Sequence, residues 1–334
     1  MCGFAGILNL DGRLSSLPSR PLLREMGSKI AHRGPDEEGL YSNNAFSCVH
    51  RRLSIIDLAT GKQPMRSQDQ SLVLVFNGEI FNFIELRAEL EAGGCQFVTH
   101  SDTEVILHLY QKYGLDFVNY LNGQFAIALW DERLQQLLLV RDRVGICPLF
   151  YTVDHGRFIF ASEVKAIRPA LGNGLSLSPE ALDQVFTFWA PVSPATIFEN
   201  VFEVPPGNML VVTRTATRQI QYWDWEYDRE ISRSSQEQLI GEFHDLLVDA
   251  TRIRLRSDVP VGAYLSGGLD SSSIVALIHK YGNVPLRTFS VNFDQENFDE
   301  AGYQQALTRK LQTEHSSILV KAEDIADSFR DTIY

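Results

Sequence analysis

The chain has 334 residues, of which 44% are hydrophobic and 22% charged, enough for about two globular domains with buried cores. Its formal net charge is −12, and no cluster of Lys and Arg interrupts the acidic balance, so binding to nucleic acid or to an anionic membrane is not expected. No apolar run reaches the roughly 20 residues that span a bilayer, and no secretory signal is recognisable, so we expect a cytoplasmic protein.

The first part of the chain predicts strands with helices between them. Strands are expected over residues 3–10, 48–57, 72–82 and 125–142, and helices over 22–34, 83–94 and 103–114. They occur in clusters rather than in alternation, which is typical of an antiparallel-rich α+β domain. We place this domain at residues 2–214 and a closing hairpin and linker at 215–235.

From residue 236 onward the pattern changes. A long helix over residues 237–255 is followed by strands and helices in strict alternation up to residue 320. This alternation predicts a parallel α/β sheet, which we assign to a second domain at residues 236–334.

The stretch LSGGLDSS, Leu265 to Ser272, lies between a predicted strand and a predicted helix. Its glycines allow a tight turn with inward N–H groups, its serines add hydroxyl donors, and the helix start adds partial positive charge, an arrangement that suits a polyphosphate. It lacks the lysine of a P-loop. The alternative, an ordinary turn with a serine cap, leaves this density of Gly and Ser unexplained.

LSGGLDSS resembles the pyrophosphate-binding loop of the ATP pyrophosphatase superfamily, whose members activate a carboxylate or carbonyl by adenylation. The resemblance implies ATP as substrate with Mg²⁺, and no prosthetic group. Leu265 and Val291 would flank the adenosine. Asp270 would either reach Mg²⁺ or cap the helix. The implied phosphate contacts are Ser266, Gly267, Gly268, Asp270, Ser271 and Ser272.

The chain begins MCGFAG, with a thiol directly after the first methionine. Because methionine is removed before a small residue, Cys2 is expected at the mature N-terminus. There its own α-amino group, with a reference pKa of about 7.7–8.0, can act as its general base. The cysteines at 48, 95 and 147 form no CxxC pair, and we interpret them as small buried residues rather than as zinc or redox ligands.

Further motifs follow Cys2 in order: HRGPD at 32–36, RRLSIID at 51–57, FNGEIFN at 76–82, SDTE at 101–104 and GQFAIALWD at 123–131. The ordered set is similar to the class II glutamine amidotransferases, whose N-terminal-nucleophile fold is an αββα sandwich. By this resemblance Asn77 and Gly78 supply the oxyanion hole. Arg52, rather than Arg51, binds the glutamine carboxylate, and Asp102 binds its ammonium. The same pocket is lined by Leu53, Ser54, Ile55, Ile56 and Glu79.

Both domains together resemble the glutamine-hydrolysing asparagine synthetases. The resemblance implies that ammonia released from glutamine passes to the second domain and amidates β-aspartyl-AMP, giving asparagine, AMP and pyrophosphate. Small molecules are then the partners, namely glutamine, aspartate and ATP, and a homodimer is compatible with the sequence.

Other readings remain open. Phosphoribosyl-pyrophosphate amidotransferases and glucosamine-phosphate synthases share the first domain but lack the LSGGLDSS loop, and β-lactam-forming synthetases lack the cysteine. A different carboxylate acceptor, or a glutamine-sensing module without synthetase activity, stays as an alternative. The apolar helix stripe of Ile325, Phe329 and Ile333 has no stop signal after it, so we expect these residues to be the N-terminal portion of a longer enzyme.

Overall fold

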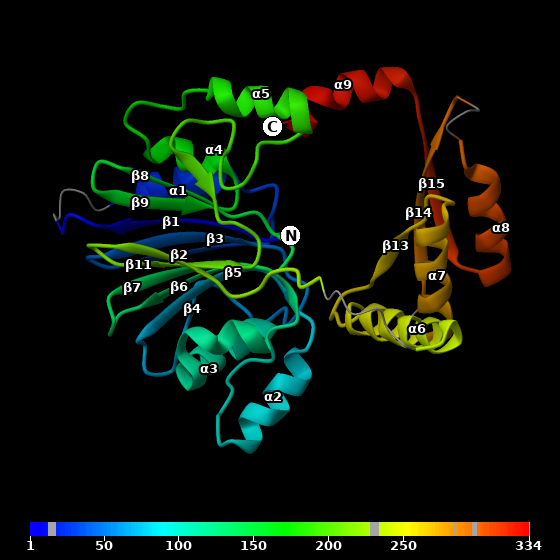
Figure 1. The fold of residues 1–334 in the computed structure, drawn as a ribbon, viewed down its shortest axis with the longest axis horizontal. Helices are drawn as coiled ribbons and strands as arrows, with labels where there is room; N and C mark the ends of the chain where they lie inside the picture. The colour runs from blue at the N-terminus through cyan, green and yellow to red at the C-terminus, as the bar shows by residue number, and fades with distance from the viewer. Residues whose placement is uncertain (13–17, 228–233, 283–284, 296–298, 334) are drawn as a thin grey trace. The chain divides into compact units, whose positions relative to one another are not determined.

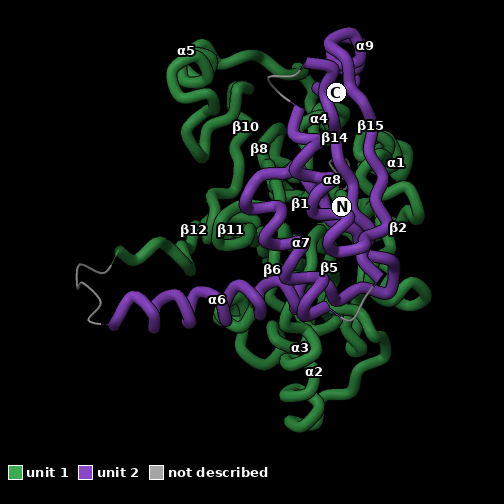
Figure 2. The backbone as a smooth tube through the Cα atoms, turned by 90° about the vertical axis from the view of Figure 1, so that its right-hand side faces the viewer, with its two compact units in different colours: residues 1–228 green, residues 229–334 purple. Residues whose placement is uncertain are grey.

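A computed structural model describes residues 1–12, 18–227, 234–282, 285–295 and 299–333. The chain divides into two compact units, residues 1–228 and 229–334 (Figures 1 and 2). The predicted linker lies largely at 228–233, outside the described residues. In the part that is described, no helix is both long and apolar enough for a membrane span.

The described residues of unit 1 form two antiparallel sheets. In spatial order, the first sheet contains β10 (Val201–Glu203), β8 (Phe150–Asp154), β9 (Arg157–Ala161), β1 (Gly3–Asn9), β3 (Phe46–Arg52) and β2 (Glu37–Ser42). The second contains β12 (Thr217–Gln221), β11 (Asn208–Val212), β7 (Gln136–Arg141), β6 (Gly123–Asp131), β5 (Leu72–Ile80) and β4 (Met65–Arg66). The expected closing hairpin is the edge of the second sheet, and it begins with β11 at Asn208, before the expected residue 215.

Strand alternation explains how these sheets stack. Val73 and Val75 of β5 face β1 and β3 across an apolar layer, whereas Leu72, Leu74 and Phe76 face the helices on the other side. Between the sheets, Phe46 stacks on Trp130 with ring centroids 5.5 Å apart.

Helices cover the outer faces of both sheets. The second sheet carries α2 (Phe83–Ala92), α3 (Asp102–Tyr113) and the 3₁₀ helix η2 (Gly114–Tyr120). The first carries α1 (Arg20–Ser28), α4 (Val164–Ile167) and η3 (Arg168–Ala170) (Figure 1). A further helix, α5 (Pro179–Phe188), belongs to the same unit. The four layers confirm the αββα sandwich.

Two predicted elements are too long. The helix expected over 22–34 ends at Ser28, and the strand expected over 48–57 ends at Arg52. Beyond Arg52 the chain leaves the sheet and forms a loop, because the Arg52 guanidinium donates hydrogen bonds to the carbonyl oxygens of Ile56 and Asp57. Asp57 itself has a φ of 52°, which lies outside the β region.

Unit 2 alternates helix and strand as predicted. Its elements are α6 (Gln236–Ile253), β13 (Gly262–Tyr264), α7 (Leu269–Tyr281), β14 (Arg287–Phe293), α8 (Ala301–Leu311), β15 (Glu314–Val320) and α9 (Ala322–Ile333). The strands pair in parallel in the order β13-β14-β15. Leu265, Val275, Ile278 and Leu286 form the buried core that is described.

Candidate functional site

Cys2 lies directly before β1, at the mouth of a pocket in unit 1. Its Sγ accepts a hydrogen bond from the Leu53 N–H at 3.3 Å and lies 3.6 Å from the Leu53 carbonyl oxygen. Its own carbonyl accepts from Arg33 Nε at 2.8 Å, and Arg33 in turn pairs with Glu163 at 2.8 Å. Burial raises the pKa of the thiol, although the Leu53 N–H opposes this by favouring the thiolate.

Asn77 and Gly78 lie near the end of β5. Alternation places the Asn77 side chain on the same face as Val73 and Val75, toward the first sheet. Asn77 is fully buried, and neither its Nδ2 nor its Oδ1 has a hydrogen-bond partner among the described residues. Gly78 has a φ of 152°, and a Cβ there would lie 2.0 Å from the Gln124 carbonyl oxygen, so only glycine fits.

The amides along β5 show which edge of the strand is available. The Phe76 N–H donates to Gln63 Oε1 at 2.6 Å, and the Ile80 N–H donates to Asp102 Oδ2 at 3.0 Å. Because N–H groups two residues apart point to the same edge, the Gly78 N–H faces this edge between them.

Arg52, which is 4% exposed, lies at the end of β3. Its Nη1 contacts Glu37 Oε2 at 3.2 Å, and its Nη2 donates to the Asp57 carbonyl at 2.6 Å. The predicted residues Leu53, Ile55 and Ile56 follow it and line the pocket. Ser54 is not among the lining residues, and its N–H donates to Asp36 Oδ2 at 2.8 Å.

Asp102 is the first residue of α3 and is 4% exposed. Burial raises the pKa of its carboxyl to about 6; the Ile80 N–H opposes this shift and the nearby Glu79 adds to it. The Asp102 carboxylate is buried at a helix start and has no cationic partner among the described residues. A cationic ligand can therefore bind there.

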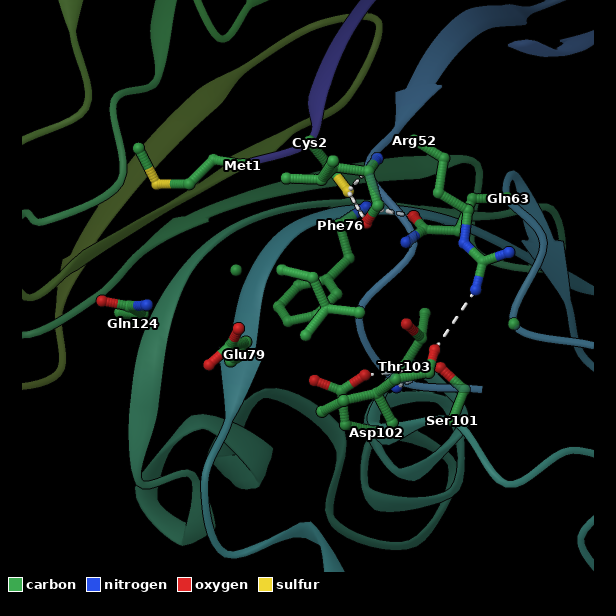
Figure 3. A pocket seen from close by; sticks show the side chains of 15 residues that line it. Met1, Cys2, Arg52, Gln63, Phe76, Glu79, Ser101, Asp102, Thr103 and Gln124 are labelled. Carbon is green, nitrogen blue, oxygen red and sulfur yellow. Dashed lines mark hydrogen bonds between the residues drawn. The ribbon is translucent and has the colours of Figure 1, made fainter. Parts of the chain in front are cut away.

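The pocket gathers most of the predicted glutamine site, although Ser54 and Asn77 are not among its lining residues. Figure 3 shows Cys2 on one side and the carboxylates of Glu79 and Asp102 on the other. Its lining also includes residues that the sequence did not assign, among them Gln63, Ser101, Thr103 and Gln124. Arg33 was also unassigned, although its presence in the HRGPD motif was a signal. Gln124 lies in the GQFAIALWD motif and carried a similar signal, whereas Gln63 carried none, because only the fold brings it to the pocket.

In unit 2, the loop from Leu265 to Ser272 connects β13 to α7. Gly267 has a φ of 99°, which requires glycine, and Gly268 is the N-cap of α7. Ser266 Oγ and Ser271 Oγ lie 3.0 Å apart, and the Gly268 N–H donates to Ser266 Oγ. The residues that follow Gly268, namely Asp270, Ser271 and Ser272, all lie in the first turn of α7.

Two buried side chains that lie outside this loop donate hydrogen bonds to its backbone carbonyl groups. Gln304 of α8 donates to the Ser266 carbonyl at 3.0 Å, and Ser290 Oγ donates to the Leu265 carbonyl at 2.5 Å. The Leu265 side chain is buried in the core, whereas Val291 is 42% exposed. Among the described residues, no cluster of His, Cys, Asp or Glu has the composition of a metal site.

The chain was compared with known families and proteins. A model described as a glutamine amidotransferase domain matches residues 1–223, and one described as asparagine synthase matches residues 242–334. Asparagine synthetase [glutamine-hydrolyzing] 1 of Bacillus subtilis is 36% identical over 97% of this chain and 51% of its own length. Amidase chyE of Penicillium rubens is 35% identical over all of this chain and 53% of its own length.

Among solved structures, glutamine phosphoribosylpyrophosphate amidotransferase from B. subtilis superposes with a TM-score of 0.48 at 17% identity, covering 96% of this chain and 81% of that one. The chain spans about half the length of the first curated relatives that it matches. On the family matches, it belongs to the class II glutamine amidotransferases, with part of an asparagine synthase domain after the amidotransferase domain.

Proposed function

We propose that unit 1 hydrolyses glutamine to glutamate and ammonia, with Cys2 as nucleophile. The observation that supports this most directly is the buried and unpartnered amide of Asn77. Native proteins rarely leave a buried polar group without a hydrogen-bond partner. An unpaired amide donor beside the pocket that holds the Cys2 thiol is therefore suited to bind a negative charge that forms only during the reaction.

The proposed reaction begins with loss of Met1, which converts the amide nitrogen of Cys2 into a free α-amine. The amine takes the thiol proton, and Sγ attacks the glutamine carboxamide carbon. Burial lowers the pKa of the α-ammonium at Met1, and the same environment would favour the neutral form of a Cys2 amine, which can accept a proton. The Leu53 N–H, 3.3 Å from Sγ, favours the thiolate during this transfer.

Attack gives a tetrahedral oxyanion, which the Asn77 Nδ2–H and the Gly78 N–H would bind. When the intermediate collapses, the C–N bond breaks and the α-ammonium returns its proton to the leaving nitrogen, so that ammonia departs and a thioester remains. Water then attacks the thioester carbon while the α-amine takes its proton. The C–S bond breaks, the proton passes to Sγ so that the Cys2 thiol is regenerated, and glutamate leaves as the second product. Glutamine and water are thereby converted to glutamate and ammonia.

The charged ends of the pocket fit the two ends of the glutamine backbone. The α-ammonium would lie against Asp102 and Glu79, on the side of the pocket away from Cys2 (Figure 3). The α-carboxylate would bind Arg52 in exchange for Glu37, whose side chain is 34% exposed and can move aside. An extended glutamine then presents its carboxamide to the thiol.

For unit 2 we propose binding of ATP through the loop at Leu265 to Ser272, and use of the ammonia to amidate an adenylated carboxylate. The glycine turn, hydroxyls and helix start fit a polyphosphate. Mg²⁺ would come with the nucleotide, and Asp270 in the first helical turn is the carboxylate that can reach it. Aspartate is the acceptor in the first proposal. Because amidases such as chyE are also relatives, a different carboxylate acceptor is the second.

Two assays on the purified chain separate these proposals. Release of glutamate from glutamine tests unit 1. Release of pyrophosphate from ATP and Mg²⁺, with aspartate or other carboxylates and with ammonia supplied, tests unit 2 and its acceptor. Glutamate release that is unaffected by Cys2→Ala would contradict the first proposal. Pyrophosphate release with another carboxylate but not with aspartate would select the second acceptor. No pyrophosphate release with any carboxylate would leave the glutaminase or glutamine-sensing alternative.

A further inference from the structure

The second sheet has an unusual edge beside the proposed oxyanion hole. On one side, β5 pairs with β6 along its whole length, from Leu72 to Ile80. On the other side, β4 pairs only with Val73 and Leu74. In the part of the chain that the structure describes, no strand continues this edge beyond Leu74. The backbone polar groups of Phe76 on this edge therefore need partners from elsewhere.

Side chains supply those partners. Gln63 Oε1 accepts from the Phe76 N–H at 2.6 Å, and His50 Nε2 lies 3.0 Å from the Phe76 carbonyl oxygen. His50 is fully buried, and Gln63 is 9% exposed. Together they replace, with side-chain groups, the two hydrogen bonds that a neighbouring strand would make with Phe76.

The tautomer of His50 follows from this contact. A carbonyl oxygen can only accept, so Nε2 carries the proton and donates it. Burial lowers the pKa of His50 to about 4, so the ring is neutral near pH 7. Its Nδ1 has no partner among the described residues. Among the described residues, His50 therefore donates to the backbone through Nε2 and makes no hydrogen bond to Cys2 through Nδ1.

His50 also connects the two halves of the proposed site. On β3, His50 pairs with Phe4 of β1, and Phe4 lies two residues after Cys2 in the chain. From there His50 reaches across the sandwich to the Phe76 carbonyl, which is part of the peptide bond to Asn77. The contact thus links the strand that starts at the thiol to the strand that carries the amide donor.

We propose that His50 and Gln63 are positioning residues that fix the Phe76–Asn77 peptide, and with it the Asn77 amide, relative to Cys2, an inference that rests on the proposed glutaminase function. Neither residue needs to touch the reacting atoms for this role. Because the oxyanion donors act only at their proper distance, a displacement of about 1 Å costs about 100-fold in rate.

The test begins with His50→Leu, which removes the donor and keeps an apolar side chain. We expect kcat for glutamine hydrolysis to fall by about 100-fold, with KM within about threefold, because Arg52 and Asp102 still hold the substrate backbone. His50→Gln, which places an amide N–H near the former Nε2, should restore most of kcat. Gln63→Met should lower kcat in the same way, and Gln63→Glu, which keeps an acceptor oxygen, should restore part of it.

Cys48→Ala is the matched control. Cys48 lies on β3 on the same face as His50, is fully buried between the sheets, and does not contact Phe76 through any hydrogen bond that the structure describes. We expect wild-type kcat for Cys48→Ala. A loss in Cys48→Ala as large as that in His50→Leu would overturn the proposal, since disturbance of the sandwich alone would then explain both.

Hydrogen exchange provides a readout that does not depend on activity and covers variants that fold poorly. Amide exchange over residues 76–80 should rise in His50→Leu and Gln63→Met and stay unchanged over β7. Unchanged exchange over 76–80 overturns the positioning role, even if the chain shows no glutaminase activity at all. If wild type is active, Cys2→Ala is inactive and the His50 variants retain kcat within about threefold, the positioning proposal fails while the proposed function stands.

Discussion

The two proposed sites differ in how far the surrounding protein encloses them. In unit 1, Asn77 is fully buried, and Arg52 and Asp102 are 4% exposed. In unit 2, the residues around the glycine loop are open, with Leu269 82% and Tyr303 73% exposed. All residues of α9 are described, and none of them is buried.

This difference matches the two kinds of chemistry proposed. A covalent attack needs donors that are fixed and shielded from water, because their effect on a forming charge is largest in a low dielectric. A polyphosphate already carries its charge, and backbone N–H groups at a helix start can bind it at an open surface. Each prediction below tests whether one site can be changed without the other.

The largest effect is expected for Cys2→Ala. Removal of the thiol deletes the covalent path, so glutamine turnover should fall by about 10⁴-fold or more. Circular dichroism and nucleotide binding by unit 2 should be unchanged. Cys95→Ala, at a partly buried cysteine outside the pocket, should retain full turnover and serves as the control. Appreciable turnover in Cys2→Ala would remove Cys2 from the mechanism.

A blocked N-terminus should abolish the same activity. An uncleaved N-terminal tag, or retained Met1, keeps the Cys2 nitrogen as an amide that cannot accept a proton. Mass spectrometry of active protein should therefore show Cys2 as the first residue, and cleavage of a tag to expose Cys2 should restore turnover. An active preparation in which Met1 is retained would refute the role of the α-amine.

Asp102→Asn should mainly weaken glutamine binding. Loss of one buried charge pairing costs about 2–5 kcal/mol, so KM should rise at least about tenfold with a smaller change in kcat. Steady-state kinetics with glutamine measure the separate changes in KM and kcat. Asp131→Asn removes a carboxylate that is equally buried but lies outside the pocket, and it should leave KM unchanged.

The same variant tests the pKa of Asp102. Its folded-state pKa of about 6 lies above the reference value of 3.8, so the native state holds the proton more tightly than the unfolded state. The contribution of Asp102 to the free energy of unfolding of wild type therefore falls as pH rises from about 4 to about 6, by about 3 kcal/mol. Asp102→Asn lacks this loss and should be more stable than wild type at pH 7. Thermal unfolding of wild type and Asp102→Asn at pH 4 and pH 7 measures this difference in stability. An equal pH dependence in the two proteins would contradict the raised pKa of Asp102.

The smallest effect is expected for Gly267→Ala in unit 2. A Cβ at this residue would meet the Glu300 carbonyl oxygen at 3.1 Å, with a φ of 99°. The strain of about 1 kcal/mol or more should weaken ATP binding by about tenfold. Calorimetric titration with ATP and Mg²⁺ measures it, and glutamine turnover should not change. Gly302→Ala, where an added Cβ meets nothing within 4 Å, is the control.

Local sequence patterns were sufficient for much of the fold. The apolar run LVLVF identified β5, period-3.6 spacing identified α2 and α3, and the Gly and Ser density at Leu265 to Ser272 marked the strand-to-helix junction. They failed after Arg52, where Leu53, Ile55 and Ile56 have the composition of a strand. The guanidinium of Arg52 binds the carbonyls of Ile56 and Asp57 and holds the chain as a loop, a contact that no local pattern records.

For the site, the sequence by itself determined the residue types: a thiol at position 2, an Asn-Gly pair, an arginine and an aspartate in ordered motifs. Only the tertiary structure decided which of their polar groups are buried, which already have partners and what surrounds them. His50 and Phe76 are 26 residues apart, and Asp102 and Ile80 are 22 apart, yet each pair is joined by a hydrogen bond. The unpartnered amide of Asn77 and the raised pKa of Asp102 result from burial, which depends on the packing of the whole sandwich rather than on neighbouring residues in the chain.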